Sequence, residues 1–153
     1  MRWTQTLIAS SLALTACGST TGVEGDLCMI EPLPLSADPN APTITDVGLE
    51  IQPGEGVIVV ATATDPDGTD NLRDVLQSVG VFPDAQCEGV PIVLRDDLVG
   101  SGVEETFGTA VSATNDPALY EAIAAAVRWP VEVDFSDADA NRTTGRVFAR
   151  IMR

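Results

Sequence analysis

The chain contains no histidine and no lysine. All eight of its basic residues are arginine. Without histidine it cannot assemble a Ser-His-Asp or Cys-His catalytic group, nor a zinc site with histidine ligands. Without lysine it cannot form a Schiff base or use Ser-Lys chemistry. The sequence also lacks a glycine-rich phosphate-binding loop. These absences exclude several classes of enzyme.

Paired carboxylates are the catalytic groups that remain, since two of them can hydrolyse a glycosidic bond. Asp96 with Asp97 and Glu104 with Glu105 are the candidates, but neighbours on a strand point to opposite faces of a sheet. Aromatic residues, which stack on sugars, make up only 5% of the chain. We therefore expect no enzyme and keep a carboxylate-based glycan hydrolase as a remote alternative.

Positive charge is scarce throughout the chain. The 23 acidic residues outnumber the arginines and give a formal charge of −15. Loss of residues 1–16, which hold one arginine and no acid, leaves −16. Such a chain repels phosphates, so nucleic acid is not expected as a partner, and anionic lipid is not attracted either. A cationic partner or a divalent cation suits this charge.

Residues 1–16 have the parts of an export signal. Arg2 precedes a short apolar stretch, residues 7–14, which cannot span a bilayer. The segment ends in Leu14-Thr15-Ala16-Cys17 and here resembles the lipobox of bacterial lipoproteins. The resemblance implies cleavage before Cys17 and lipid on its thiol, with more than one acyl chain giving a stable anchor. The alternative is an ordinary signal peptide with an unrelated cysteine.

The residue after the lipidated cysteine bears on location. Gly18 is not the aspartate that retains lipoproteins in the inner membrane. The expected place is therefore the cell envelope, at the outer membrane, with the domain facing either the periplasm or the cell surface.

Three cysteines leave two once Cys17 carries lipid. Cys28 and Cys87 are then predicted to form a disulfide, because an exported chain meets an oxidising environment. This bridge closes a loop of about 60 residues and stabilises the fold by roughly 4 kcal/mol on the chain-entropy model. Two unpaired thiols are the alternative.

Two regions follow the predicted signal peptide. Residues 17–41 are rich in glycine, proline, serine and threonine and are predicted to be a lipidated N-terminus with an extended tether. Residues 42–153 are long enough for one domain. Short apolar segments with a period of two predict strands there. Their ranges are 43–51, 57–64, 73–82, 90–94, 103–112, 131–135 and 146–152.

One helix is predicted within this strand pattern, over residues 117–128. Asp116 is the expected N-cap and Pro117 the first helical residue. Leu119, Ile123 and Val127 share one side, which we expect to pack over an open end of the fold. A partner-binding helix is the alternative.

Seven strands with one inserted helix predict a mainly β fold, an antiparallel β-sandwich of immunoglobulin-like type. The best-defined part is the final hairpin, in which Glu132 and Asp134 on one strand face arginines on the next. We expect solvated ion pairs there, with a basic binding strip as the alternative.

The segment Asp38-Pro-Asn-Ala-Pro42, with Ala63-Thr-Asp-Pro-Asp-Gly68 at the end of the second predicted strand, resembles cadherin-like modules of bacterial surface proteins. In an immunoglobulin-like sandwich the loops around these segments and before the last strand lie at one end. Clustered carboxylates there predict a structural Ca²⁺ site, and solvated turns are the alternative. The candidate ligands are Asp65, Asp67, Asp70, Asn71, Asp137, Asp139 and Asn141, with Asp38 and Asn40 beside them.

We expect the protein to be a non-catalytic binding or adhesion module on a lipid anchor. Its expected partner is an unidentified envelope protein or glycan. A structural or accessory subunit of an envelope complex is the alternative, and the predicted helix would then supply a contact.

Overall fold

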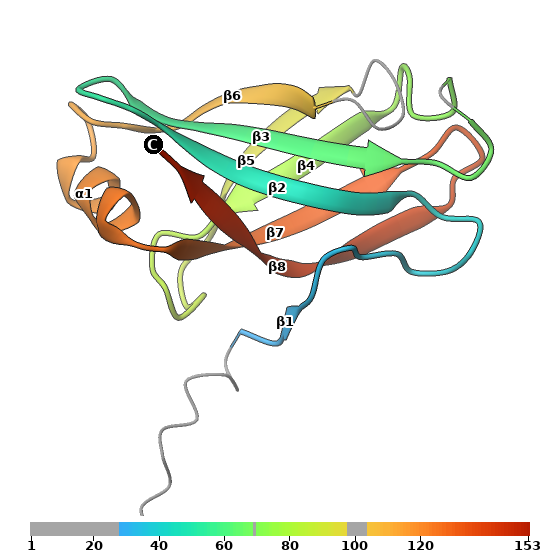
Figure 1. The fold of residues 1–153 in the computed structure, drawn as a ribbon, viewed down its shortest axis with the longest axis horizontal. Helices are drawn as coiled ribbons and strands as arrows, with labels where there is room; N and C mark the ends of the chain where they lie inside the picture. Colours follow the sequence, from blue (N-terminus) through green and yellow to red (C-terminus); the bar gives the residue numbers. More distant parts are fainter. Residues whose placement is uncertain (1–27, 69, 98–103) are drawn as a thin grey trace, which may run out of the picture.

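The structure, a computed structural model, describes residues 28–68, 70–97 and 104–153, which form eight strands and one helix (Figure 1). The expected mainly β fold with a single helix is confirmed. The predicted signal peptide, residues 1–16, and the predicted lipidation site Cys17 lie outside the described residues. The elements are β1 (Ile30–Glu31), β2 (Thr43–Gln52), β3 (Gly56–Thr64), β4 (Leu76–Val81), β5 (Ile92–Asp97), β6 (Glu104–Ser112), α1 (Pro117–Ala125), β7 (Arg128–Ser136) and β8 (Arg142–Met152).

The strands form one mixed sheet in the order β5-β4-β7-β8-β2-β3-β6, with β1 paired to β8 outside this path. The expectation of purely antiparallel pairing is wrong at two places, because β8 pairs in parallel with β1 and with β2. The sheet curls until its edge strands β5 and β6 contact each other, which makes it nearly barrel-shaped (Figure 1). Because β2 links β3 to β8, hydrogen bonding does not divide the sheet into two layers.

The core fills the inside of this curl. Alternate residues of β3, β4, β7 and β8 point inwards, as the period-two pattern predicts. Leu119 and Ile123 of α1 join them at one end of the sheet, so the expected packing of the helix is confirmed for these two residues. Phe107 and Phe135 add two aromatic rings, with centroids 6.0 Å apart.

The helix is shorter than predicted. It ends at Ala125, and Ala126 already has extended backbone angles. Val127, expected on the packed face, is 86% exposed, so that prediction is wrong. The reason is that β7 already begins at Arg128, so the chain has to become extended before this residue. Pro130 is buried within this strand and is not merely a stop signal for the helix.

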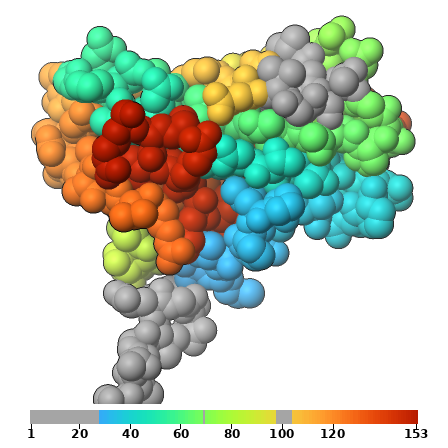
Figure 2. Space-filling model, viewed as in Figure 1, coloured from blue at the N-terminus to red at the C-terminus, as the bar shows by residue number. Residues whose placement is uncertain are grey.

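The second half of the predicted tether lies against the domain. From Cys28 onwards the chain is described, and β1 pairs with Arg146 and Val147 of β8. Leu35 forms a bridge to Ile44 and is buried. Figure 2 shows this segment, in blue, resting on the surface of the strands. Residues 28–41 therefore lie against the domain, with Cys28, Leu35 and Ala41 buried, and residues 17–27 lie outside the described part.

The final hairpin has the predicted facing, and the structure gives its register. Val131 lies opposite Val147, and both are buried. On the outer face Glu132 lies opposite Arg146 and pairs with it, at 3.4 Å between Oε2 and Nε. Asp134 pairs with Arg142. The cross-strand ion pairs expected from the sequence are therefore present.

Candidate functional site

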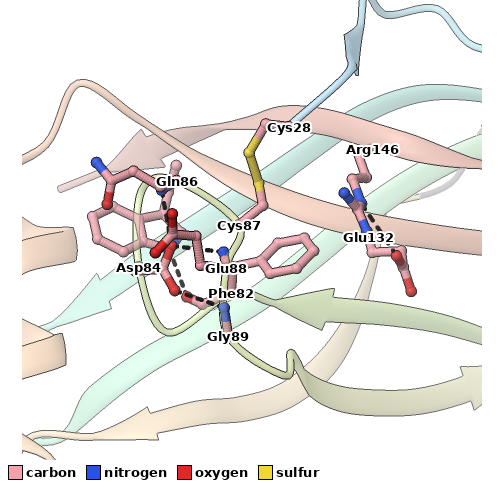
Figure 3. Close-up of a disulfide and its surroundings, with 10 residues drawn as sticks. Cys28, Phe82, Asp84, Gln86, Cys87, Glu88, Gly89, Glu132 and Arg146 are labelled. Atoms are coloured by element: carbon pink, nitrogen blue, oxygen red, sulfur yellow. Dashed lines mark hydrogen bonds and ion pairs between the residues drawn. A yellow bond between two sulfur atoms is a disulfide. The ribbon is translucent and has the colours of Figure 1, made fainter. Parts of the chain in front are cut away.

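The predicted disulfide joins Cys28 to Cys87 with a Cα–Cα distance of 5.5 Å (Figure 3). Cys28 precedes β1 and is buried, whereas Cys87 lies in the loop between β4 and β5. Cys87 has a positive φ of 58°, which is uncommon for a residue with a side chain. The bridge thus attaches the N-terminal segment to a loop with a tightly defined backbone.

Asp84 fixes that loop. Its carboxylate accepts backbone N–H groups from Glu88 at 3.0 Å, Gly89 at 2.9 Å and Gln86 at 2.9 Å (Figure 3). These bonds, that of Glu88 first, lower the pKa of Asp84 below its ordinary value of 3.8, because they favour the charged form. The convergence of N–H groups on this one carboxylate was not predicted from the sequence.

Thr143 of β8 ties the N-terminal segment to the sheet at a second point. Its hydroxyl donates to the carbonyl of Pro42 at 2.7 Å and accepts the N–H of Ala37 at 3.1 Å. Thr143 is fully buried. Gly145, two residues on, lets the segment approach closely, because a Cβ at this position would lie 2.7 Å from the Leu35 side chain.

A surface hollow of about 630 Å³ lies where the docked N-terminal segment meets β7 and β8. Both ion pairs of the final hairpin line it, and Arg146 also lies over the Phe82 ring, 5.2 Å from its centroid. Figure 3 shows the Glu132–Arg146 pair beside the disulfide. The residues that line the hollow are Met29, Glu31, Glu132, Val133, Asp134, Arg142, Thr144, Gly145 and Arg146.

The candidate calcium ligands lie mostly in two loops that contact each other at one end of the sheet. The N–H of Ala138 donates to the Asn71 carbonyl at 2.8 Å. The Asn71 side chain donates to Asp65 at 3.1 Å and lies 3.5 Å from a carboxylate oxygen of Asp139. In the second loop, Asn141 donates to Asp137 through its backbone and its side chain, both at 2.8 Å.

The other candidates are placed differently. Asp70 forms an exposed pair with Arg73 at 3.2 Å. Asp67 is exposed, and its N–H donates to Asp65 at 2.9 Å. Asn40 donates through its N–H to Asp38. Asp38 and Asp65 both line a second hollow of about 570 Å³, together with Ser36, Pro39, Thr43, Thr64 and Pro66.

Amide groups separate several of these carboxylates. Within residues 28–68, 70–97 and 104–153, no three acidic or cysteine side chains lie close enough to hold a metal ion together. Asn71 and Asn141 each donate to an aspartate, which satisfies carboxylate oxygens that a cation would otherwise use. Calcium binding stays a prediction.

The carboxylates considered for glycan hydrolysis lie on the two edge strands. Asp96 and Asp97 end β5, where the N–H of Asp97 donates to the Asp96 carboxylate at 2.9 Å. Glu104 begins β6 and lies 3.5 Å from Arg150 of β8. Glu104 is thus held in an ion pair on the exposed face.

Comparison of the chain with models of known protein families, with curated proteins and with solved structures found no match. Among the described residues, no helix has the length and apolar character needed to cross a membrane.

Proposed function

We propose that the chain is an envelope lipoprotein, anchored through lipid on Cys17, whose β domain is a non-catalytic binding or adhesion module. The partner is a protein or glycan of the envelope, and the outer membrane is the proposed location. The lipobox at Leu14–Cys17 supports the anchor. The absence of histidine and lysine from the sequence supports a role without catalysis.

One observation carries the proposal furthest, namely the attachment of the N-terminal segment to the domain. The Cys28–Cys87 disulfide and the pairing of β1 with β8 hold the chain from residue 28 onwards. Only residues 17–27 then separate this attachment from the proposed lipid. A domain held so close to its anchor is suited to a partner within short reach of the membrane.

We also propose that the curled sheet is an immunoglobulin-like sandwich. In this interpretation β2, β3 and β6 form one layer and β5, β4, β7 and β8 form the other, with β2 crossing between them. The strand order supports it, because the first long strand pairs antiparallel with the second and parallel with the last. Cross-strand amide contacts along the whole of β5 and β6 in solution would instead indicate a closed barrel.

Metabolic labelling with an alkyne fatty acid tests the anchor. The full chain should incorporate the label and fractionate with membranes, and Cys17→Ala should lose the label. Cys28→Ala is the matched control, because it removes a different cysteine and should keep the label. Label retained in Cys17→Ala would contradict lipidation at this residue.

Cross-linking in intact cells tests the binding role. A photoreactive residue at exposed surface positions should capture one partner reproducibly, whereas capture of none from any face would contradict a binding module. Protease added outside intact cells separates the two orientations. Cleavage indicates a surface adhesion module, and protection indicates an inward-facing accessory subunit.

A calcium ion at the two acidic loops is a separate proposal. The contact between these loops, together with the burial of Asp65 and Asp137, supports it. Carboxylate, amide and carbonyl oxygens are ligands that Ca²⁺ accepts.

A further inference from the structure

We propose that the 630 Å³ hollow between the docked N-terminal segment and strands β7 and β8 binds a basic segment of a partner protein, a lysine or arginine flanked by apolar residues. This inference rests on the proposed binding role and specifies the surface and the partner chemistry. Below, this hollow is called the β1–β7 hollow.

The charges that line the β1–β7 hollow are unequal. Arg142 and Arg146 face three carboxylates, and each arginine is already paired, with Asp134 and with Glu132 respectively. The third carboxylate is Glu31, which is exposed. Within the described part of the chain no arginine pairs with it. The side chains that line the hollow therefore carry one more negative than positive charge, and a single cation is complementary to it.

The apolar side chain of Met29 lines the same hollow as this carboxylate. Met29 is 80% exposed although it follows the buried Cys28 directly. Methionine is flexible and adapts its shape to different partners. A lysine or arginine could place its charged end at Glu31 and its aliphatic stem, or a neighbouring apolar residue, against Met29.

Anionic partners suit the hollow less well, even though two arginines line it. Each guanidinium is committed to a carboxylate on the neighbouring strand. The formal charge of the whole chain, −15, also repels anions and attracts cations over a distance. Local pairing and overall charge therefore favour the same class of partner.

The disulfide is required for the β1–β7 hollow in this proposal. Met29 and Glu31 form one of its walls, and they lie one and three residues from Cys28. Before the chain reaches the contacts of Leu35, this wall is held by the Cys28–Cys87 bond and by the two-residue strand β1. Removal of the bond should loosen this wall and weaken binding without removing any carboxylate.

The test uses oxidised protein of residues 18–153 and the peptide acetyl-Gly-Leu-Lys-Leu-Gly-amide, followed by amide chemical shifts during titration. A second peptide with norleucine in place of lysine has the same shape without the charge. We expect shifts concentrated at Glu31, Thr144 and Gly145. Glu31→Gln should weaken binding about two- to fivefold, as for a partly exposed ion pair. The norleucine peptide should bind more weakly by a similar factor.

Two further variants distinguish the β1–β7 hollow from general attraction to an acidic protein. Glu121→Gln removes an exposed carboxylate on α1 and should leave binding unchanged. Cys28→Ser should weaken binding even though residue 31 is still a glutamate. The overall fold of this variant should be retained, as judged by its amide spectrum. Shifts scattered over many acidic residues, or equal effects of Glu31→Gln and Glu121→Gln, would overturn the proposal.

The two levels of the proposal fail separately. If cross-linking in cells captures a partner but the peptide does not bind at the β1–β7 hollow, the binding role stands and this surface is wrong. If cross-linking captures no partner from any face, the binding role itself is wrong.

Discussion

At the scale of single residues, buried polar side chains hold parts of the chain together that are far apart in sequence. Gln77 is fully buried, and its side-chain amide exchanges two hydrogen bonds of 2.7 Å with the backbone of Ser136. It extends the pairing of β4 with β7 beyond the ladder itself. Thr143 does the same for the N-terminal segment. Each of these groups would be costly to leave without a partner.

The first prediction concerns Thr143 and its neighbour. Thr143→Val removes the hydroxyl and leaves the Pro42 carbonyl and the Ala37 N–H without it. We expect a loss of about 1–3 kcal/mol in the free energy of unfolding, since these partners are part-buried or buried. Urea denaturation of the wild type and of Thr143→Val measures this difference in the free energy of unfolding. Thr144→Val is the matched control on the exposed side and should change stability by less than about 0.5 kcal/mol.

The second prediction concerns Asp84 and pH. Its pKa lies below 3.8 in the folded protein, so the ionised carboxylate stabilises the fold at neutral pH. That contribution is present above the unfolded-state pKa and is lost as the pH falls through the lower folded-state value. Asp84→Asn keeps an acceptor oxygen without the charge. It should lower Tm by about 3–6 °C at pH 7 and by less at pH 3.

Thermal unfolding followed by circular dichroism between pH 7 and pH 3 gives this comparison. Glu88→Gln is the control, because it removes a carboxylate from the same loop while the Glu88 N–H still donates to Asp84. A difference between wild type and Asp84→Asn that stays constant over this pH range would contradict the role of the charge.

At the scale of elements, α1 shows how a short helix is limited at both ends. Asp116 accepts the N–H of Leu119 at 3.3 Å, and Pro117 follows, as the sequence predicts. At the other end the guanidinium of Arg153 donates to the carbonyls of Ala124 and Ala126, at 2.9 Å and 2.6 Å. A positive group there complements the helix dipole and satisfies carbonyls that have no partner within the helix.

The third prediction follows from this cap. Arg153→Gln should lower stability by about 0.3–1 kcal/mol, the usual worth of a cation at a helix C-terminus. It should also speed hydrogen exchange of the backbone amides in α1 more than in β7. Arg73→Gln is the control, since Arg73 lies away from α1 in the sequence and its side chain forms an exposed pair with Asp70. Equal exchange rates in α1 for wild type and Arg153→Gln would show that the cap is unimportant.

At the scale of the whole molecule, the curl of the sheet brings distant loops together at one end. The contact of Ala138 with Asn71 joins the loop after β3 to the loop after β7. The disulfide lies elsewhere, in the loop between β4 and β5. The disulfide and the acidic loops therefore occupy different parts of the surface, whereas Asp38 of the N-terminal segment lines a hollow together with Asp65.

The fourth prediction tests calcium at the acidic loops. Oxidised protein of residues 18–153 is unfolded thermally with EDTA and then with millimolar Ca²⁺. A site with a Kd near 10 μM should add about 2.7 kcal/mol at 1 mM free ion, a shift of several degrees. A double change of Asp65 and Asp137 to Asn should abolish the shift, and Glu121→Gln should keep it. No shift in the unmodified protein would leave these loops as solvated turns.

The sequence by itself determined the local features of this protein. Period-two patterning located all seven long strands, and Asp116 with Pro117 located the start of the helix. Alternation along β7 and β8 determined which of their side chains are buried, because successive residues on a strand face opposite sides. The disulfide pair was predicted because the lipobox resemblance assigns Cys17 another role, and the structure confirms the Cys28–Cys87 bridge.

Only the tertiary structure decided what depends on contacts between segments far apart in the chain. The docking of residues 28–41 needs Thr143 and Gly145 on the last strand, and nothing in the composition of this proline-rich segment indicates a packed structure. The parallel pairing of β2 with β8 and the curl of the sheet likewise arise from long-range packing. Local patterns fix which side of a strand is apolar, whereas the choice of neighbouring strand is made by the whole core.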